Sequence, residues 1–167
     1  MPKYCWFDIK RWELLLKYFK GGKLIDLGSY DSLLPYMAKI KYLSKVFPKT
    51  SICEIYKIDW IPDRLKAEDN TFDYVVAGQV IEHLEKPKEF VKEVYRILKP
   101  KGVLALSCPY KETERGEVDK DHLWKGITEK DIRDLLKDFK KVKIKIIGSK
   151  YLPYKYNFEH LICYAWK

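Results

Sequence analysis

The residues best suited to chemistry lie in a short acidic turn near the start of the chain, Asp26-Leu27-Gly28-Ser29-Tyr30-Asp31. Gly28 allows the backbone to turn tightly and to approach a ligand. The carboxylates of Asp26 and Asp31 bracket this turn, and at a helix start they repel a pyrophosphate and attract an ammonium or sulfonium ion. The turn also lacks the G-x-G-x-x-G spacing and the lysine of a phosphate-binding loop. It therefore favours a cationic ligand, although each acid alone could equally be structural, Asp31 as a helix N-cap.

The cysteines and the net charge point to no other chemistry. The four cysteines are widely scattered, without a C-x-x-C pair or a cluster with histidine at metal-ligand spacing, so we expect neither a metal site nor a disulfide framework. The formal charge of +9 would suit a polyanion. However, Lys141, Lys143 and Lys145 alternate with apolar residues, as on the solvated face of a strand. Nucleic acid is therefore a possible partner but not the favoured one.

The elements that must position the acidic turn follow from hydrophobic periodicity and from glycine, proline and capping residues. In chain order the pattern predicts a helix over Ile9–Phe19, a strand at Lys23–Leu27, a helix from Asp31 or Ser32 to Phe47, a strand within Ser51–Ile58, a strand at Phe72–Gly78, a helix at Lys88–Leu98, a strand at Val103–Ser107, a helix opening at Thr128, and strands near Val142–Ile147 and Glu159–Trp166. Strands that alternate with helices predict an α/β fold, a mostly parallel sheet with helices on both faces.

Two stretches depart from regular alternation. About ten residues join the last two strands, which is too few for a helical crossover and predicts one antiparallel strand near the C-terminus. Asp59–Thr71 can hardly supply a crossover helix and a further strand, so we expect a reduced region between the second and fourth strands. The length of 167 residues suits a single domain over residues 1–167. Without a membrane-spanning apolar run or a signal-peptide pattern, we expect a cytoplasmic protein with no membrane partner.

Several strings together resemble the class I S-adenosylmethionine-dependent methyltransferases. These strings are Leu24–Ser29, Asn70–Val76, Val80–Leu84, Glu93–Gly102 and Asp121–Trp124. The specific part is the central block, which keeps an unbroken register from about Ala67 to Pro109, whereas the match of the first turn is short. The resemblance implies a small, single-domain member with a Rossmann-like sheet and S-adenosyl-L-methionine as cofactor.

The resemblance also implies which residues contact that cofactor. The expected cofactor-binding residues are Asp26, Gly28, Ser29, Tyr30, Asp59, Gly78 and Gln79. Asp59 is expected to bind the ribose hydroxyls because a carboxylate that ends a strand is a strong bidentate acceptor, and Glu54 is the alternative. Tyr30 and Ser32 stand where the family has smaller residues, which places bulk beside the cofactor path.

The resemblance implies methyl transfer to an acceptor that the sequence does not identify: a small molecule, a glycan or a protein side chain. His122, His83 and Tyr110 are the candidate catalytic bases, needed only if the acceptor must lose a proton. His122 ranks first because it lies in a polar segment after a buried strand, although each histidine could equally be structural. The alternatives are an RNA or DNA methyltransferase and a degenerate, non-catalytic scaffold. The tracts expected to form the acceptor pocket are rich in Trp, Tyr and Lys and could also contact a second subunit of a homodimer.

Overall fold

The fold is built on one β-sheet, and two of its inner strands carry predicted site residues such as Asp26 and Gly78. The computed structural model describes residues 6–28, 34, 37–38, 53–58, 65–115, 119–148 and 159–167. In this part of the chain six strands pair in the order β2-β1-β3-β4-β6-β5. Their bounds are β1 Gly22–Leu27, β2 Cys53–Ile58, β3 Phe72–Gly78, β4 Leu98–Pro109, β5 Lys141–Ile147 and β6 His160–Trp166.

The strand directions confirm the mostly parallel sheet with an antiparallel strand near the C-terminus. β2, β1, β3 and β4 pair in parallel, with Leu27 opposite Ala77 and Ala77 opposite Leu106. β6 is antiparallel to both of its neighbours, β4 and β5. The carboxyl ends of β1, β3 and β4 therefore emerge together at one edge of the sheet, where ligands bind in open α/β folds.

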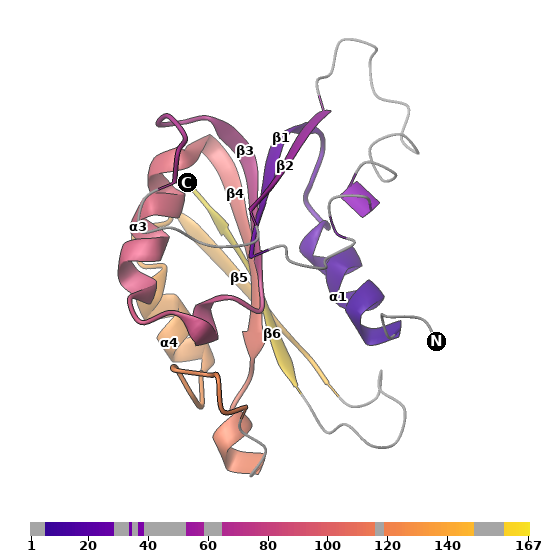
Figure 1. Cartoon of the computed structure of the whole chain (residues 1–167), viewed down its shortest axis with the longest axis vertical. Coiled ribbons are helices and arrows are strands. Elements are labelled where there is room, and N and C mark those ends of the chain that lie inside the picture. Colours follow the sequence, from indigo (N-terminus) through magenta and orange to yellow (C-terminus); the bar gives the residue numbers. More distant parts are fainter. Residues whose placement is uncertain are drawn as a thin grey trace.

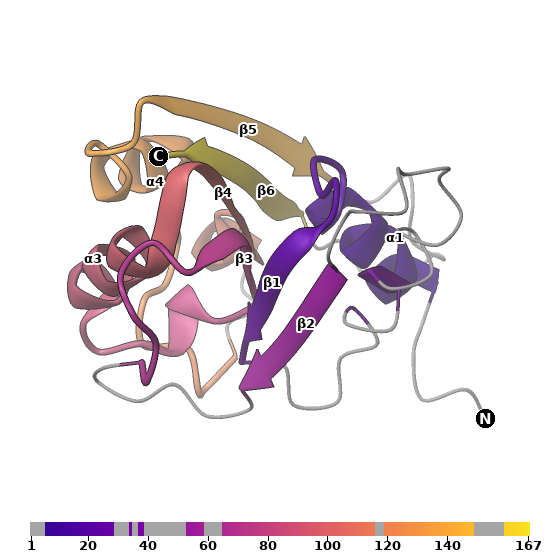
Figure 2. The same cartoon turned by 90° about the horizontal axis from the view of Figure 1, so that it is seen from above.

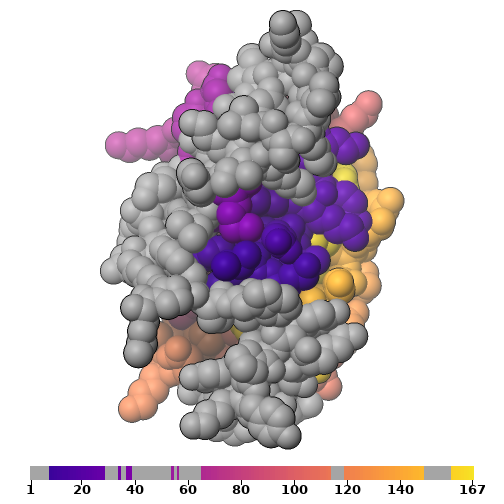
Figure 3. All heavy atoms as spheres, turned by 90° about the vertical axis from the view of Figure 1, so that its right-hand side faces the viewer, coloured from indigo at the N-terminus to yellow at the C-terminus, as the bar shows by residue number. Residues whose placement is uncertain are grey.

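Helices cover both faces of the sheet, as expected (Figures 1 and 2). α1, Trp6–Leu15, packs on one face, and α3, Pro87–Ile97, and α4, Glu129–Leu135, pack on the other. The side chains of β3 alternate accordingly: Val76 joins the cluster with α1 and Val75 joins the cluster with α3 and α4. Figure 3 views the α1 side, where α1 lies at the centre of the surface. The structure therefore has two apolar layers, one on each side of the sheet.

Local signals explain where the helices begin and end. Thr128 caps α4 in a capping box, in which its hydroxyl accepts from the Asp131 backbone N–H and the Asp131 carboxylate accepts from the Thr128 backbone N–H. α1 ends at Leu15, earlier than the predicted Phe19, and Gly21 and Gly22, with positive φ angles of 105° and 91°, lie at the junction with β1 instead of capping the helix. β4 begins at Leu98, earlier than the predicted Val103, because Leu98 already pairs with Phe72; after an irregularity in the register, pairing with β3 continues from Val103 opposite Tyr74.

The region between β2 and β3 is reduced in the part that the structure describes, since residues 65–71 form neither helix nor strand. Residues 59–64 lie outside the described residues. Of the helix predicted up to Phe47, Leu34, Met37 and Ala38 are described, and all three are helical. Among the described helices, none combines the length and the apolar character needed to span a membrane.

Candidate active site

The end of β1 places a buried carboxylate and a sharp turn at the carboxyl edge of the sheet. Asp26 is 3% exposed and pairs with Val76 of β3 and Lys57 of β2. Gly28 follows β1 with φ of 69°, in the left-handed region where a side chain would be strained. The buried carboxylate and the glycine turn fit a cationic ligand that approaches the backbone closely. Ser29, Tyr30 and Asp31 lie outside the described residues.

The end of β3 lies beside this turn, because Leu27 and Ala77 are opposite each other in the sheet. Gly78 is the last residue of β3, and Gln79 follows with φ of 58°, unusual for a residue with a side chain. A Cβ atom on Gly78 would lie 3.2 Å from Leu15 Cδ1, so this position has little spare room. The structure therefore brings Asp26, Gly28, Gly78 and Gln79 to one edge.

The two candidate ribose ligands occupy different positions. Glu54 is the second residue of β2, opposite Lys23 at the start of β1, and hence far from the carboxyl edge. Its Oε2 atom accepts a hydrogen bond from Tyr56 at 2.7 Å and lies 3.2 Å from Lys23 Nζ. Tyr56 and Lys23 together hold the pKa of Glu54 below its usual value. Asp59 comes directly after Ile58, the last residue of β2, but lies outside the described residues. The position of Glu54 does not suit a ligand at the carboxyl edge.

The two leading candidate bases come together although they are far apart in the sequence. The rings of His83 and His122 are 4.8 Å apart in an edge-to-face arrangement. His83 belongs to η1, a short helix at Ile81–His83 that follows β3, and His122 belongs to the segment after η2, Glu112–Arg115. The backbone N–H groups of Leu123 and Trp124 donate to the Glu82 carbonyl oxygen at 2.7 and 3.0 Å. These two bonds hold His122 beside His83.

Each histidine is oriented through its Nδ1 atom. His122 Nδ1 lies 2.7 Å from Glu112 Oε2, with the two side chains 11% and 6% exposed. His83 Nδ1 lies 3.0 Å from the Asp121 backbone oxygen. Both oxygens are acceptors, so each ring donates its Nδ1–H and keeps a lone pair on Nε2. The structure thus leaves Nε2 of both rings available to accept a proton or to bind a cation.

A buried glutamate completes this group. Glu82 is 0% exposed, and its carboxylate has a ligand oxygen within 4.8 Å of ring nitrogens of His83 and His122. Burial raises the pKa of Glu82 to about 8, opposed by the positive charge of Arg11. The sequence interpretation missed Glu82 and Glu112 as functional residues. The signal that could have found Glu82 is its place in Val80–Leu84, a string that carried the resemblance.

Tyr110 does not join the histidine pair. It follows β4 directly, and its backbone N–H donates to the Glu159 carbonyl oxygen at 2.8 Å, next to the start of β6. Its ring is half-buried against the core and has the Lys111 ammonium 5.8 Å from its centre. Tyr110 therefore lies at the carboxyl edge, but no contact between it and either histidine occurs among the described residues. The segment Tyr151–Phe158, also expected near the acceptor, lies outside the described residues.

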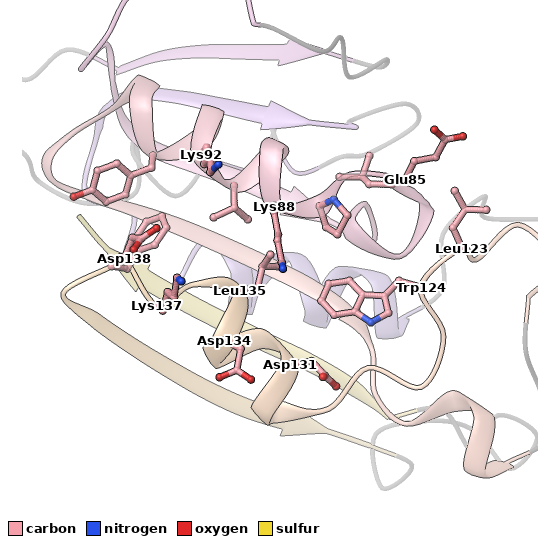
Figure 4. Close-up of a pocket in the computed structure, with 15 residues that line it drawn as sticks. Glu85, Lys88, Lys92, Leu123, Trp124, Asp131, Asp134, Leu135, Lys137 and Asp138 are labelled. Atoms are coloured by element: carbon pink, nitrogen blue, oxygen red, sulfur yellow. The ribbon is translucent and has the colours of Figure 1, made fainter.

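A surface groove between α3 and α4 is separate from the carboxyl-edge residues. Lys88 and Lys92 of α3 and Asp131 and Asp134 of α4 lie on its walls (Figure 4). None of the predicted site residues lines it. It adjoins the histidine pair through Leu84, which directly follows His83, and through Leu123 and Trp124, which directly follow His122. The groove therefore abuts the proposed acceptor side without containing the cofactor residues.

The chain is similar to methyltransferases in sequence and in fold. A family model described as "Methyltransferase domain" matches residues 38–106. Sterol 24-C-methyltransferase ERG6 of Saccharomyces cerevisiae is 32% identical over 88 residues, which are 53% of this chain. The matched region spans 22% of the length of that curated relative.

Solved structures share the fold at low sequence identity. A S-adenosylmethionine-dependent methyltransferase of Thermotoga maritima, a possible histamine N-methyltransferase, has a TM-score of 0.70 at 16% identity and covers 96% of this chain and 89% of that one. Phosphoethanolamine N-methyltransferase 2 of Haemonchus contortus, in complex with S-adenosyl-L-methionine, has a TM-score of 0.71 at 13% identity, with coverage of 95% and 52%. At these identities the likeness concerns the fold.

Proposed function

We propose that this chain, which is similar to the class I S-adenosylmethionine-dependent methyltransferases, transfers a methyl group from S-adenosyl-L-methionine to an acceptor bound at the carboxyl edge of the sheet. One observation carries the proposal. The buried Asp26 carboxylate and the left-handed Gly28 turn lie directly beside Gly78 and Gln79, at adjacent strand ends. We treat residues 1–167 as one catalytic domain.

The residues at this edge have distinct proposed roles. When bound, the cofactor supplies a methyl group on a positively charged sulfur, which the acceptor displaces in line. The buried Asp26 carboxylate favours a positively charged ligand. Gly28 allows the backbone to come close to that ligand, and Ser29 and Tyr30, the next residues in the sequence, are proposed to contact it. Gly78 and Gln79 form the adjoining wall, and Asp59 is the proposed ligand of the ribose hydroxyls.

We propose that the methyl acceptor binds beside the histidine pair, His83 and His122. If the acceptor must lose a proton, His122 accepts it at Nε2, because the Nδ1–H is held by Glu112 at 2.7 Å. This hydrogen bond stabilises the imidazolium that forms, since Glu112 supplies a nearby negative charge. His83 is the second candidate base, and Tyr110, apart from the pair, is the third. Much of the rate acceleration would come from positioning rather than from covalent catalysis.

Calorimetric titration with S-adenosylhomocysteine tests the cofactor site. We expect the wild-type chain to bind it and Asp26→Asn to bind at least about tenfold more weakly, which corresponds to about 1.4 kcal/mol. Asp73→Asn is the matched control. Asp73 is a carboxylate on the neighbouring strand β3, but at the far end, where it contacts the Lys23 backbone N–H and the Lys99 ammonium. Equal affinity of the wild type and Asp26→Asn would contradict the role of Asp26.

Absence of binding by the folded wild type would favour the degenerate-scaffold alternative. The acceptor class is open among small molecules, glycans and protein side chains, and sterol and phosphoethanolamine methyltransferases are among the similar proteins. A nucleic-acid substrate predicts salt-sensitive retention on mixed RNA. A cytoplasmic location and a homodimer stay predictions. The buried free thiols of Cys108 and Cys163 are compatible with that location.

A further inference from the structure

We propose that Glu82, His83 and His122 form a binding site for one divalent transition-metal ion at the carboxyl edge of the sheet. One carboxylate oxygen and one nitrogen from each ring lie within 4.8 Å of one another. Ligands at 2.0–2.2 Å from a tetrahedral ion lie about 3.3–3.6 Å apart, so side-chain rotation must bring this set closer by about 1 Å. His83 is exposed, which gives an ion a route from solvent.

The hydrogen bonds of the two histidines already have the pattern of metal ligands. A ligand histidine usually donates its other ring N–H to a carboxylate or a backbone carbonyl, which fixes the ring and raises its basicity. His122 does so to Glu112 Oε2 at 2.7 Å, and His83 does so to the Asp121 carbonyl oxygen at 3.0 Å. The two rings use the two common kinds of supporting acceptor, and both present Nε2.

Glu82 supplies the second, independent observation. It is 0% exposed, and neither of its carboxylate oxygens accepts a hydrogen bond from another residue in the part of the chain that the structure describes. A buried carboxylate without such a partner is costly unless it neutralises, pairs with a charge or binds a cation. A bound divalent ion would supply that positive charge directly at the buried carboxylate.

The local charge favours a cation although the whole chain is basic, with a formal charge of +9. Glu82 and Glu112 are both buried here, and Asp119 interacts electrostatically with both histidines. Arg11 is the positive side chain that acts on Glu82, and it is itself paired with Asp8 at 3.2 Å. The cluster therefore presents two buried carboxyl groups to a cation, and a bound ion would favour the ionised form of Glu82.

The donor set indicates the class of ion and its consequence for the histidines. Two imidazoles and one carboxylate suit Zn²⁺, Fe²⁺ or Co²⁺ and leave coordination positions open for an acceptor oxygen or nitrogen. A ring nitrogen that binds an ion cannot also accept a proton. The metal site and the general-base role of His122 are therefore alternative uses of the same Nε2 atom, and metal binding decides between them.

The test is a metal titration of the full chain, purified without a polyhistidine tag and freed of metal with a chelator. Zn²⁺ is titrated by calorimetry, and Co²⁺ by the visible absorption of the bound ion. We expect one ion per wild-type chain, and at least about tenfold weaker binding by Glu82→Gln, His83→Ala and His122→Ala. Glu112→Gln should weaken binding by about 10–100-fold, because it removes the support of His122.

His160→Gln is the matched control, since His160 on β6 is the third histidine of the chain and lies outside the cluster. It should bind as the wild type does. The exposed His83 side chain makes His83→Ala decisive even if a buried variant fails to fold, as judged by circular dichroism. Absence of binding by the wild type, unchanged binding by His83→Ala, or an equal loss in His160→Gln would overturn the site. The titration needs no cofactor, so its result is independent of S-adenosylhomocysteine binding.

Discussion

Gln79 donates two hydrogen bonds to Ser107, from its backbone N–H to the carbonyl oxygen at 2.9 Å and from its side-chain Nε2 to Oγ at 3.2 Å. Ser107 is fully buried on β4, so these bonds fix the chain just beyond β3 onto the neighbouring strand. They also hold Gln79 in the left-handed region, with φ of 58°. The turn at Gln79, which belongs to the proposed wall of the cofactor site, is therefore strained but held in place by these bonds. Such strained backbone is common at functional sites.

Two substitutions of Gln79 separate its side chain from its backbone conformation. Gln79→Gly and Gln79→Val both remove the side-chain amide and keep the backbone N–H. Of the two replacements, only glycine adopts a positive φ without strain. We expect Gln79→Val to be less stable than Gln79→Gly by about 1–2 kcal/mol, measured by urea denaturation. Equal stability of the two variants would show that the left-handed conformation is not retained in solution.

Gly102 is predicted to tolerate no side chain. A Cβ atom there would lie 2.8 Å from the Lys99 carbonyl oxygen and 3.0 Å from Leu98 Cδ2. Since the closer atom belongs to the backbone, Gly102→Ala should destabilise the chain by about 1–3 kcal/mol in thermal or urea unfolding. Gly148→Ala is the control, because its Cβ would meet the flexible side chain of Glu159 at 2.8 Å. A cost in Gly148→Ala as large as in Gly102→Ala would refute the backbone explanation.

The Tyr74 hydroxyl links the sheet to α1. It is buried and donates to the Leu15 carbonyl oxygen at 2.6 Å, and burial raises its pKa well above the usual value. Tyr74→Phe leaves that carbonyl without this donor and should lower the free energy of unfolding by about 1–2 kcal/mol. Tyr95→Phe removes a hydroxyl from a half-buried ring of α3 that packs against Phe139, and it should lower the free energy of unfolding less. Denaturation curves of the two variants in parallel test this, and a reversed order would argue against the link.

Cys163 gives the chain a predicted sensitivity to alkali. Burial raises the pKa of its thiol from 9.0 to about 12. Between these values the unfolded chain loses the thiol proton and the folded chain keeps it, so stability is full below about pH 9 and falls as the pH rises. The slope from this thiol is at most about 1.4 kcal/mol per pH unit. Cys163→Ala should therefore show a shallower decline in unfolding free energy from pH 9 to 11. Parallel declines in the two proteins would exclude this contribution.

The fold was predictable because each strand and helix carries a local signal that its packing reinforces. Phe72–Gly78 was predicted as a strand and forms β3 with the same bounds, since its apolar residues are buried on both faces. Thr128 was predicted to open a helix and caps α4. The antiparallel β6 followed from the short connection after β5, because chain length alone excludes a crossover helix there.

The site was only partly predictable, because proximity between distant segments leaves no local signal. The common location of Asp26, Gly28, Gly78 and Gln79 was predictable, because they lie at the ends of predicted strands and the carboxyl ends of neighbouring parallel strands lie at the same edge of the sheet. The expectation of no metal cluster considered spacing along the chain. It could not foresee that backbone hydrogen bonds to the Glu82 carbonyl oxygen would bring His122 to His83. The Glu112–His122 pair was missed for the same reason.

The position of β6 has a consequence for synthesis on the ribosome. β6 lies between β4 and β5, yet both of those strands are translated before it. Until His160–Trp166 emerges, β4 and β5 each present an unpaired edge, which is prone to join other chains. The nascent protein can therefore assemble β1, β3 and β4 early, but its sheet closes only after β6 has been translated, and truncation before β6 would yield an aggregation-prone product.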